Sequence, residues 1–315
     1  MKQRDITQKT PTLEKEKSKG VPFTTYVAAL IAVGLWGFSF VWSNTLIIND
    51  IKIITFLFTR LFIAGILLFV FSKAIGKLQK IERKDYKWLF AMAASEPFIY
   101  FIGESYGMQA TGSATITSLI IGTIPVVCLL YERVAWGIKF TLYKSVGILI
   151  TIPGILLVVI NDEGMSVEHG YGIALLFLAV FAATSYAIFV KKLAAKYNSF
   201  TIATYQFLIG ALLFFPFFII YGTDGFTPQF FTFKIISTLL SLAILCSCVA
   251  FVLWVVSIGN LGIARANTFS ALMPGISALG AYMLGQEKIT LYIIFGIVIV
   301  TTGVILAQHK ESKEQ

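Results

Sequence analysis

The sequence has 315 residues, of which 57% are hydrophobic and only 13% are charged. Soluble domains carry about 25% charged residues, so this composition excludes a water-soluble globular protein and indicates one embedded in a lipid bilayer. The formal net charge is +9. It does not indicate a nucleic-acid partner, because the basic residues lie in short segments between apolar runs, where they act as topology signals.

In chain order, residues 1–22 are rich in charged residues, Thr and Pro, and predict a disordered cytoplasmic tail. The chain then divides into apolar runs of the length that crosses a bilayer as a helix, about 20 residues. We expect an all-α integral membrane protein. The protein is predicted to have ten transmembrane helices, at 26–48, 53–72, 88–108, 114–136, 143–160, 171–190, 201–221, 235–257, 267–285 and 290–308. A short cytoplasmic tail at 309–315 is predicted to follow the last helix.

The distribution of Lys and Arg predicts the orientation. With the N-terminus in the cytoplasm, 20 of the 25 basic residues lie on the cytoplasmic side, three lie on the opposite side, and Arg60 and Arg133 lie within spans. This satisfies the positive-inside rule. We therefore expect a multi-pass protein of the cell membrane with both termini in the cytoplasm. The three Cys residues lie inside apolar runs and are interpreted as buried hydrophobic side chains, so we expect neither a metal site nor a cofactor.

Several unusual residues coincide when the sequence is shifted by 149 positions. The pairs are Pro125 and Pro274, Lys139 and Lys288, Thr141 and Thr290, Tyr143 and Tyr292, Gly147 and Gly296, and Gly154 and Gly303. With five helices per copy, the second copy enters the membrane from the opposite face. We therefore expect two inverted five-helix repeats, at 23–160 and 171–308, which is a transporter architecture. The paired glycines are interpreted as a close-packing seam, within the scaffold or of a homodimer.

Four motifs resemble the drug/metabolite transporter superfamily, EamA type. They are Trp36-Gly37-Phe38-Ser39-Phe40, Arg60 in the second span, Gly103 to Gln109, and 264–290 with Pro274 and Gly285-Gln286-Glu287-Lys288. The family signature places a Glu thirteen residues after its Pro in both halves. The second half of this chain keeps it as Glu287, whereas the first half has Ile138.

The resemblance implies a secondary transporter of amino acids or other small organic metabolites, by export or import. Transport would be coupled to an ion gradient or to the solute gradient itself. Which ion is coupled stays open, and a proton is one of the candidates. Its partners would be the solute and the lipid bilayer, and a homodimer also stays open. A non-transporting membrane partner or sensor, and a channel, are the alternatives. An enzyme is not expected, because the sequence has no HExxH helix, no paired midplane aspartates and no Ser/His arrangement.

Charged residues inside the spans are the first site candidates, because a charge in the bilayer needs a partner or water. Glu96, Tyr100 and Glu104 are spaced four residues apart and share one face of the third helix. Glu96 precedes Pro97, which favours a kink, and lies near the midplane. We expect Glu96 to bind a cationic group of the solute or a coupling proton, with a protonated structural carboxyl group as the alternative. Arg60 lies at a depth that permits an ion pair with Glu104.

Aromatic and polar side chains of other spans complete the predicted cavity, because small amphipathic solutes bind to aromatic walls with a few polar groups. Interfacial anchoring and helix-internal hydrogen bonds are the alternatives for these residues. The predicted substrate-binding or coupling residues besides Arg60, Glu96, Tyr100 and Glu104 are Trp36, Ser39, Trp42, Tyr186, Tyr205, Gln206, Trp254 and Asn267. Thr184, Ser185, Thr268 and Ser270 are weaker candidates.

Overall fold

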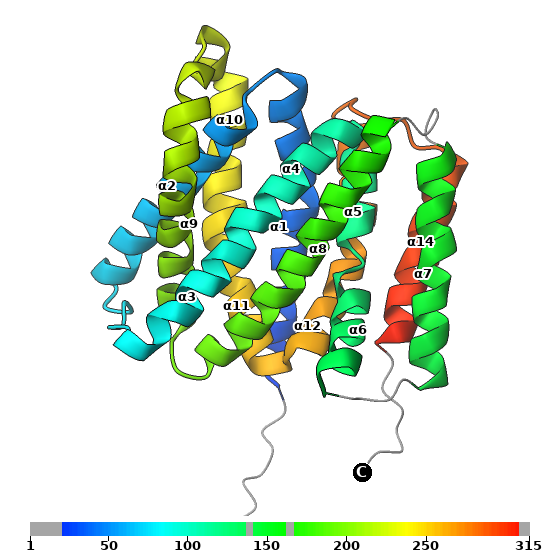
Figure 1. Ribbon diagram of the computed structural model, residues 1–315, viewed down its shortest axis with the longest axis horizontal. Coiled ribbons are helices and arrows are strands. Elements are labelled where there is room, and N and C mark those ends of the chain that lie inside the picture. Colours follow the sequence, from blue (N-terminus) through cyan, green and yellow to red (C-terminus); the bar gives the residue numbers. More distant parts are fainter. Residues whose placement is uncertain (1–20, 137–140, 162–166, 309–315) are drawn as a thin grey trace, which may run out of the picture.

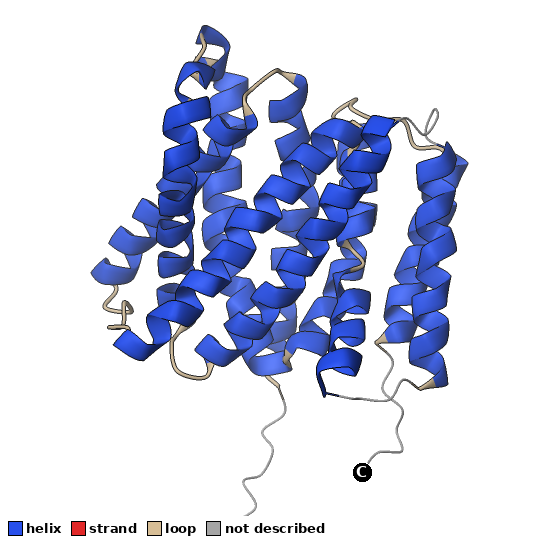
Figure 2. Cartoon of the chain, in the orientation of Figure 1, coloured by secondary structure: helices blue, strands red, loops and turns tan. Residues whose placement is uncertain are grey.

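The computed structural model describes residues 21–136, 141–161 and 167–308, and within these ranges all regular structure is helical (Figures 1 and 2). The first half comprises α1 (Phe23–Ile48), α2 (Ile53–Ala74), α3 (Tyr86–Ala93), α4 (Tyr100–Thr111), α5 (Ala114–Ile121), α6 (Ile124–Trp136) and α7 (Leu142–Asn161). The second half comprises α8 (Val167–Ala194), α9 (Ser199–Tyr221), α10 (Phe233–Ser241), α11 (Ala250–Leu261), α12 (Ile263–Thr268), α13 (Met273–Met283) and α14 (Leu291–Ala307).

These helices fall into the ten expected segments, because several short helices continue one another. Seven segments of the described chain are long and apolar enough to cross a membrane, and α14 is apolar but shorter. The other two, 86–111 and 263–283, are interrupted along their length. The protein is thus an all-α, multi-spanning structure, and the count of ten crossings stays a prediction.

The interruptions occur at matching places in the two halves. A π-helical turn, Ala94–Ile99, joins α3 to α4, and a second, Leu242–Val249, joins α10 to α11. The fourth span of each half is also divided, and its second helix carries a Pro in its first turn, Pro125 in α6 and Pro274 in α13. A Pro is tolerated there because the N–H groups of a first turn have no partner within the helix.

The packing of the two halves is reciprocal. The first span of each half packs against the third and fourth spans of the other: α1 contacts α11 and α13, and α8 contacts α4 and α5. The second, fourth and fifth spans pair with their own counterparts, α2 with α9, α5 with α13 and α7 with α14. In Figure 1, α1 rises from the lower end and α8 descends from the upper end. Such pairing is what two inverted repeats produce.

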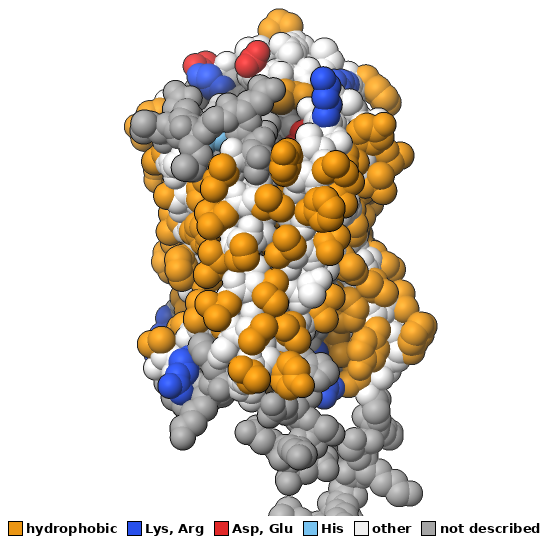
Figure 3. Space-filling view, turned by 90° about the vertical axis from the view of Figure 1, so that its right-hand side faces the viewer, with side chains coloured by type: hydrophobic (Ala, Val, Ile, Leu, Met, Phe, Trp, Pro, Cys, Tyr) orange, Lys and Arg blue, Asp and Glu red, His pale blue; other side chains and the backbone are white. Residues whose placement is uncertain are grey.

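Two faces of the molecule follow from this arrangement. We call the end at which α1 begins and α14 ends the inner face, and the opposite end the outer face (Figure 1). Figure 3 shows apolar side chains over the middle of one flank, with charged side chains gathered at its two ends. Such a flank suits contact with lipid. The assignment of the inner face to the cytoplasm stays a prediction.

The paired glycines lie at the contact between α7 and α14. A Cβ atom added to Gly147 would lie 2.6 Å from the carbonyl oxygen of Gly303, and one added to Gly296 would lie 3.0 Å from that of Gly154. The first distance is shorter than real Cβ contacts and the second is tighter than most of them, so the helices cross this closely because glycine occupies these positions. The seam therefore joins the two repeats within one chain, and the reading of these glycines as a homodimer seam is wrong.

Glu287 and its neighbour fasten three spans at the outer face. The Glu287 carboxylate accepts hydrogen bonds from the N–H groups of Ala114 and Thr115 at 2.6 and 3.2 Å, which caps the N-terminus of α5. The Gln286 amide donates to the Val41 carbonyl and the Thr45 hydroxyl of α1. The corresponding position in the first half, Ile138, lies outside the described residues.

Candidate functional site

A central cavity lies between the two repeats. The first four spans of each repeat contribute side chains to it, with the exception of α9, the second span of the second repeat. Nine of the twelve predicted site residues line it. They are Trp36, Ser39, Arg60, Glu96, Tyr100, Glu104, Tyr186, Trp254 and Asn267. The cavity has a volume of about 50 Å³. A single water needs roughly 10–15 Å³ of cavity, so a solute larger than a few waters requires the cavity to widen.

The third span carries the two carboxyl groups of the cavity. Glu96 has non-helical backbone angles, φ −144° and ψ 119°, at the turn that joins α3 to α4, and its peptide bond to Pro97 is cis. The predicted kink at Pro97 is therefore confirmed. Tyr100 and Glu104 follow on α4, one and two turns further on, and line the same cavity.

Both carboxyl groups are buried in the cavity wall. Glu96 is 6% exposed and Glu104 is 3% exposed. Within the part of the chain that the structure describes, neither side chain forms a hydrogen bond or an ion pair within 4.0 Å. Buried carboxyl groups are costly unless something compensates them. A ligand cation, a proton or water inside the cavity is what these two groups can bind.

Arg60 lies opposite the carboxyl groups, but not in the expected ion pair. Its Nε donates to the Ser247 hydroxyl at 2.8 Å, and its guanidinium carbon lies 4.4 Å from the centroid of the Phe101 ring. Among the described residues, no ion pair within 4.0 Å joins Arg60 to Glu104. The guanidinium is held by a hydroxyl group and an aromatic face instead. It still interacts electrostatically with Glu96 and Glu104.

One wall of the cavity is aromatic. The Trp36 ring lies edge-on to Phe251 and Trp254, with centroids 4.9 and 5.0 Å apart. Its Nε1 donates to the Cys246 carbonyl at 3.1 Å, inside the π-helical turn of the eighth span. Tyr186 lies edge-on to the same Phe251 ring. The wall is therefore fixed by ring contacts and one hydrogen bond, and presents apolar surface to the cavity.

The remaining predicted residues lie around this cavity or away from it. Gln206 is fully buried behind Tyr186, whose hydroxyl donates to its Oε1 at 3.3 Å. Trp42 packs against Phe38 on α1, and neither it nor Tyr205 lines the cavity. Among the weaker candidates Ser270 lines the cavity, whereas Thr184 and Ser185 donate to backbone carbonyls of their own helix. That last arrangement is the alternative expected for helical hydroxyl groups.

Several residues in or next to the cavity are not predicted by the sequence. Ser247 lies in an apolar run, where a hydroxyl group usually bonds its own helix, yet it accepts a hydrogen bond from Arg60. Phe101 and Phe251 are two of 28 phenylalanines. No local pattern distinguishes them, because their role depends on which helices meet at the cavity.

Known proteins resemble the chain over most of its length. Residues 23–160 and 170–308 each match the model of the EamA-like transporter family. An uncharacterized transporter of Archaeoglobus fulgidus is 25% identical over 285 residues, covering 90% of this chain and 99% of the relative. The uncharacterized transporter YoaV of Bacillus subtilis is 22% identical over 274 residues, covering 86% and 92%. A solved crystal structure of 14% identity superposes with a TM-score of 0.69 over 90% of this chain and 98% of its own, which shows the shared fold.

The two family matches correspond to the two halves that pack reciprocally around the cavity. The matched residues span most of the sequence, and the relatives carry transporter names. The helices of the described chain are long and apolar enough for a multi-pass membrane protein. On this basis the chain belongs to the EamA-like transporter family, whose members move small solutes across membranes and are not enzymes.

Proposed function

We propose that the protein is a secondary carrier of small organic solutes that bear an ammonium group, amino acids above all. The observation that carries the proposal is the pair of buried carboxyl groups, Glu96 and Glu104, which line the cavity and have no hydrogen bond or ion pair with any residue that the structure describes. An ammonium group of the solute would compensate them. The Arg60 guanidinium, which lines the same cavity, suits a carboxylate on the same solute.

The aromatic wall supports the same class of solute. Trp36, Phe251 and Trp254 offer apolar surface beside the charged groups. A small amphipathic molecule fits such a mixed cavity, with its polar end near Glu96 and Arg60 and its apolar part against the rings. Glu96 and Glu104 are also able to hold a proton when no solute is bound. We therefore propose exchange of solute for protons by alternating access between the two repeats.

The test is flux in liposomes that contain the purified full-length protein. Uptake of labelled amino acids and of small amines is measured with and without an imposed pH gradient. Flux that follows the gradient supports proton exchange, and gradient-insensitive solute exchange retains the carrier without proton coupling. Absence of flux for every solute would contradict the proposal.

Glu96→Gln tests the assigned carboxyl group. A hydrogen bond to a charged group contributes about 1.5–3 kcal/mol, so we expect roughly a 10- to 100-fold loss of flux at subsaturating solute. Asp50→Asn is the matched control, because it makes the same change on an exposed outer loop and Asn tolerates the positive φ of 55° found there. An unchanged rate and pH dependence in Glu96→Gln would remove Glu96 from the mechanism.

A further inference from the structure

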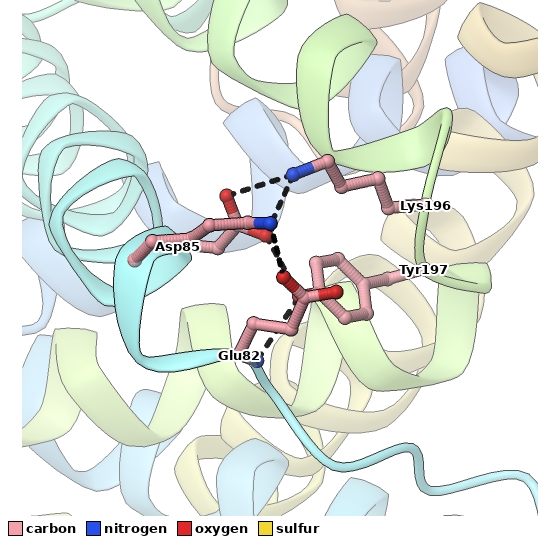
Figure 4. Close-up of polar contacts among 5 residues, drawn as sticks. Glu82, Asp85, Lys196 and Tyr197 are labelled. Atoms are coloured by element: carbon pink, nitrogen blue, oxygen red, sulfur yellow. Dashed lines mark hydrogen bonds and ion pairs between the residues drawn. The ribbon is translucent and has the colours of Figure 1, made fainter.

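Two ion pairs join the repeats at opposite faces. At the inner face, Lys196 Nζ lies 3.1 and 2.9 Å from the two carboxylate oxygens of Asp85 (Figure 4). Asp85 precedes α3 in the first repeat, and Lys196 lies between α8 and α9 in the second. At the outer face, Lys52 pairs with Asp224. Lys52 lies between α1 and α2, and Asp224 lies between α9 and α10.

The two pairs occupy equivalent places in the inverted repeats. Each acid follows the second span of its own repeat, and each lysine lies between the first and second spans of the other repeat. The inverted architecture therefore places the same acid–lysine pair across each face. In carriers built from inverted repeats, one part rocks against the other around the central site, so a contact that joins the repeats at one face resists their separation there.

The inner pair is part of a dense polar network (Figure 4). The Tyr197 hydroxyl donates to Asp85 Oδ2 at 2.9 Å, and the Glu82 N–H donates to the same hydroxyl at 3.1 Å. The Asp85 side chain is only 4% exposed. The charge of this carboxylate is thus compensated by two partners in a site that excludes most water, which strengthens each hydrogen bond.

Backbone contacts extend the inner network along the same two loops. The Asn198 N–H donates to Gln79 Oε1 and the Asn198 Nδ2 donates to the Lys77 carbonyl, each at 2.7 Å. The Gln79 N–H donates to the Thr201 hydroxyl at 2.9 Å. We call the contacts of Lys77, Gln79, Glu82 and Asp85 with Lys196, Tyr197, Asn198 and Thr201 the inner latch.

The outer counterpart is weaker. Its side chains are exposed, 49% for Lys52 and 69% for Asp224. One further hydrogen bond, from the Thr55 hydroxyl to the Gly222 carbonyl at 2.7 Å, reinforces it. We call these two contacts the outer latch. Solvent screens an exposed ion pair, so the outer latch resists separation less than the inner latch does.

We propose that the inner and outer latches are gates of the cavity, and that the inner latch resists opening of the inner face more than the outer latch alone resists opening of the outer face, where Glu287 and Gln286 also join the repeats. The proposal rests on the carrier function proposed above. The narrow cavity supports it, because a solute enters only when the repeats separate at one face. A change that breaks one latch therefore shifts the population towards the state that is open at that face.

The test measures access to the cavity from each face and requires no known solute. A thiol is introduced by Ser39→Cys, at a cavity position that is only 6% exposed, and is labelled with a membrane-impermeant maleimide in right-side-out and inside-out vesicles. The parent chain without this substitution gives the background from the native cysteines. Asp85→Asn is expected to raise labelling from the inner face roughly three- to tenfold, the ratio for losing a partly screened charge-assisted hydrogen bond. Asp224→Asn is expected to raise labelling from the outer face, by a smaller factor.

Two further variants separate gating from local damage. Lys84→Gln removes an exposed ion pair with Glu82 in the same loop, one that does not join the repeats, and is expected to leave labelling unchanged. The exchanged pair, Asp85→Lys with Lys196→Asp, is expected to restore most of the low labelling. Unchanged labelling in Asp85→Asn, or an equal rise from both faces, would overturn the proposal. Flux without a labelling response contradicts the latches alone, whereas a labelling response without flux for any solute contradicts the carrier function alone.

Discussion

We expect Arg60 to determine what kind of solute the cavity accepts. Its guanidinium is fixed by Ser247 and by the Phe101 ring, so it is oriented before any solute binds. We expect Arg60→Gln to reduce uptake of amino acids at least tenfold, because their carboxylate loses a charge-assisted partner. Uptake of a simple amine of similar size should change much less. Ser247→Ala is the milder companion variant, since it leaves the charge in place, and an equal loss for both solutes would contradict this role of Arg60.

At this scale the sequence predicts which side chains are unusual but not what they contact. Glu96 and Glu104 are conspicuous because carboxyl groups are rare inside apolar runs, and their four-residue spacing with Tyr100 places all three on one cavity. The expected ion pair of Arg60 with Glu104 is not formed among the described residues, because the depth of a residue along its helix does not specify the direction of its side chain. Arg60 turns instead to Ser247, 187 positions away in the sequence.

Among the elements, the contact between α7 and α14 is the most tightly constrained. A Cβ atom added to Gly147 would lie 2.3 Å from the backbone nitrogen of Ala307. We expect Gly147→Ala to force the helices apart and to lower the free energy of unfolding by about 1–3 kcal/mol. Gly34→Ala is the matched control, because an added Cβ meets nothing within 4 Å there. It should be neutral or slightly stabilising, since Ala favours the helix. Thermal unfolding of both variants in detergent measures the difference, and equal midpoints would contradict a close-packed seam.

The apolar runs of the sequence predict where the helices lie, but the sequence predicts only some of the interruptions in these helices. Pro97 predicts the break in the third span, because proline removes a backbone donor. The matching turn at Leu242–Val249 contains no Pro, and only the repeat relates it to the first. The 149-residue shift predicts which spans are equivalent, yet the use of the glycines within one chain depends on which helices meet in three dimensions.

For the whole molecule, the two inverted repeats place similar acid–lysine pairs at both faces but give them different surroundings. The repeat alone does not predict this difference, because it arises in the loops. Lys77, Gln79 and Tyr197 contribute inner contacts, whereas the outer pair stays exposed. An architecture that is symmetric in its helices is therefore asymmetric in the loop contacts that surround these two ion pairs.

The inner latch also predicts how stability depends on pH. The hydrogen bond from Lys196, together with that from Tyr197, holds the pKa of Asp85 below its ordinary value; Lys84 acts in the same direction, and Glu82 is the other charged group beside the pair. A carboxyl group whose folded-state pKa is lowered stabilises the fold above its unfolded pKa, and this contribution is lost as pH falls through the folded pKa. We therefore expect Asp85→Asn to be less stable than the wild type at about pH 6 and to approach it at about pH 3, below the ordinary Asp pKa of about 3.9.

Thermal unfolding in detergent at the two pH values measures this convergence. Lys84→Gln is the control, because its ion pair with Glu82 is exposed and should contribute little at either pH. A deficit of Asp85→Asn that stays the same at acid pH would show that the variant disturbs packing rather than the ionised pair.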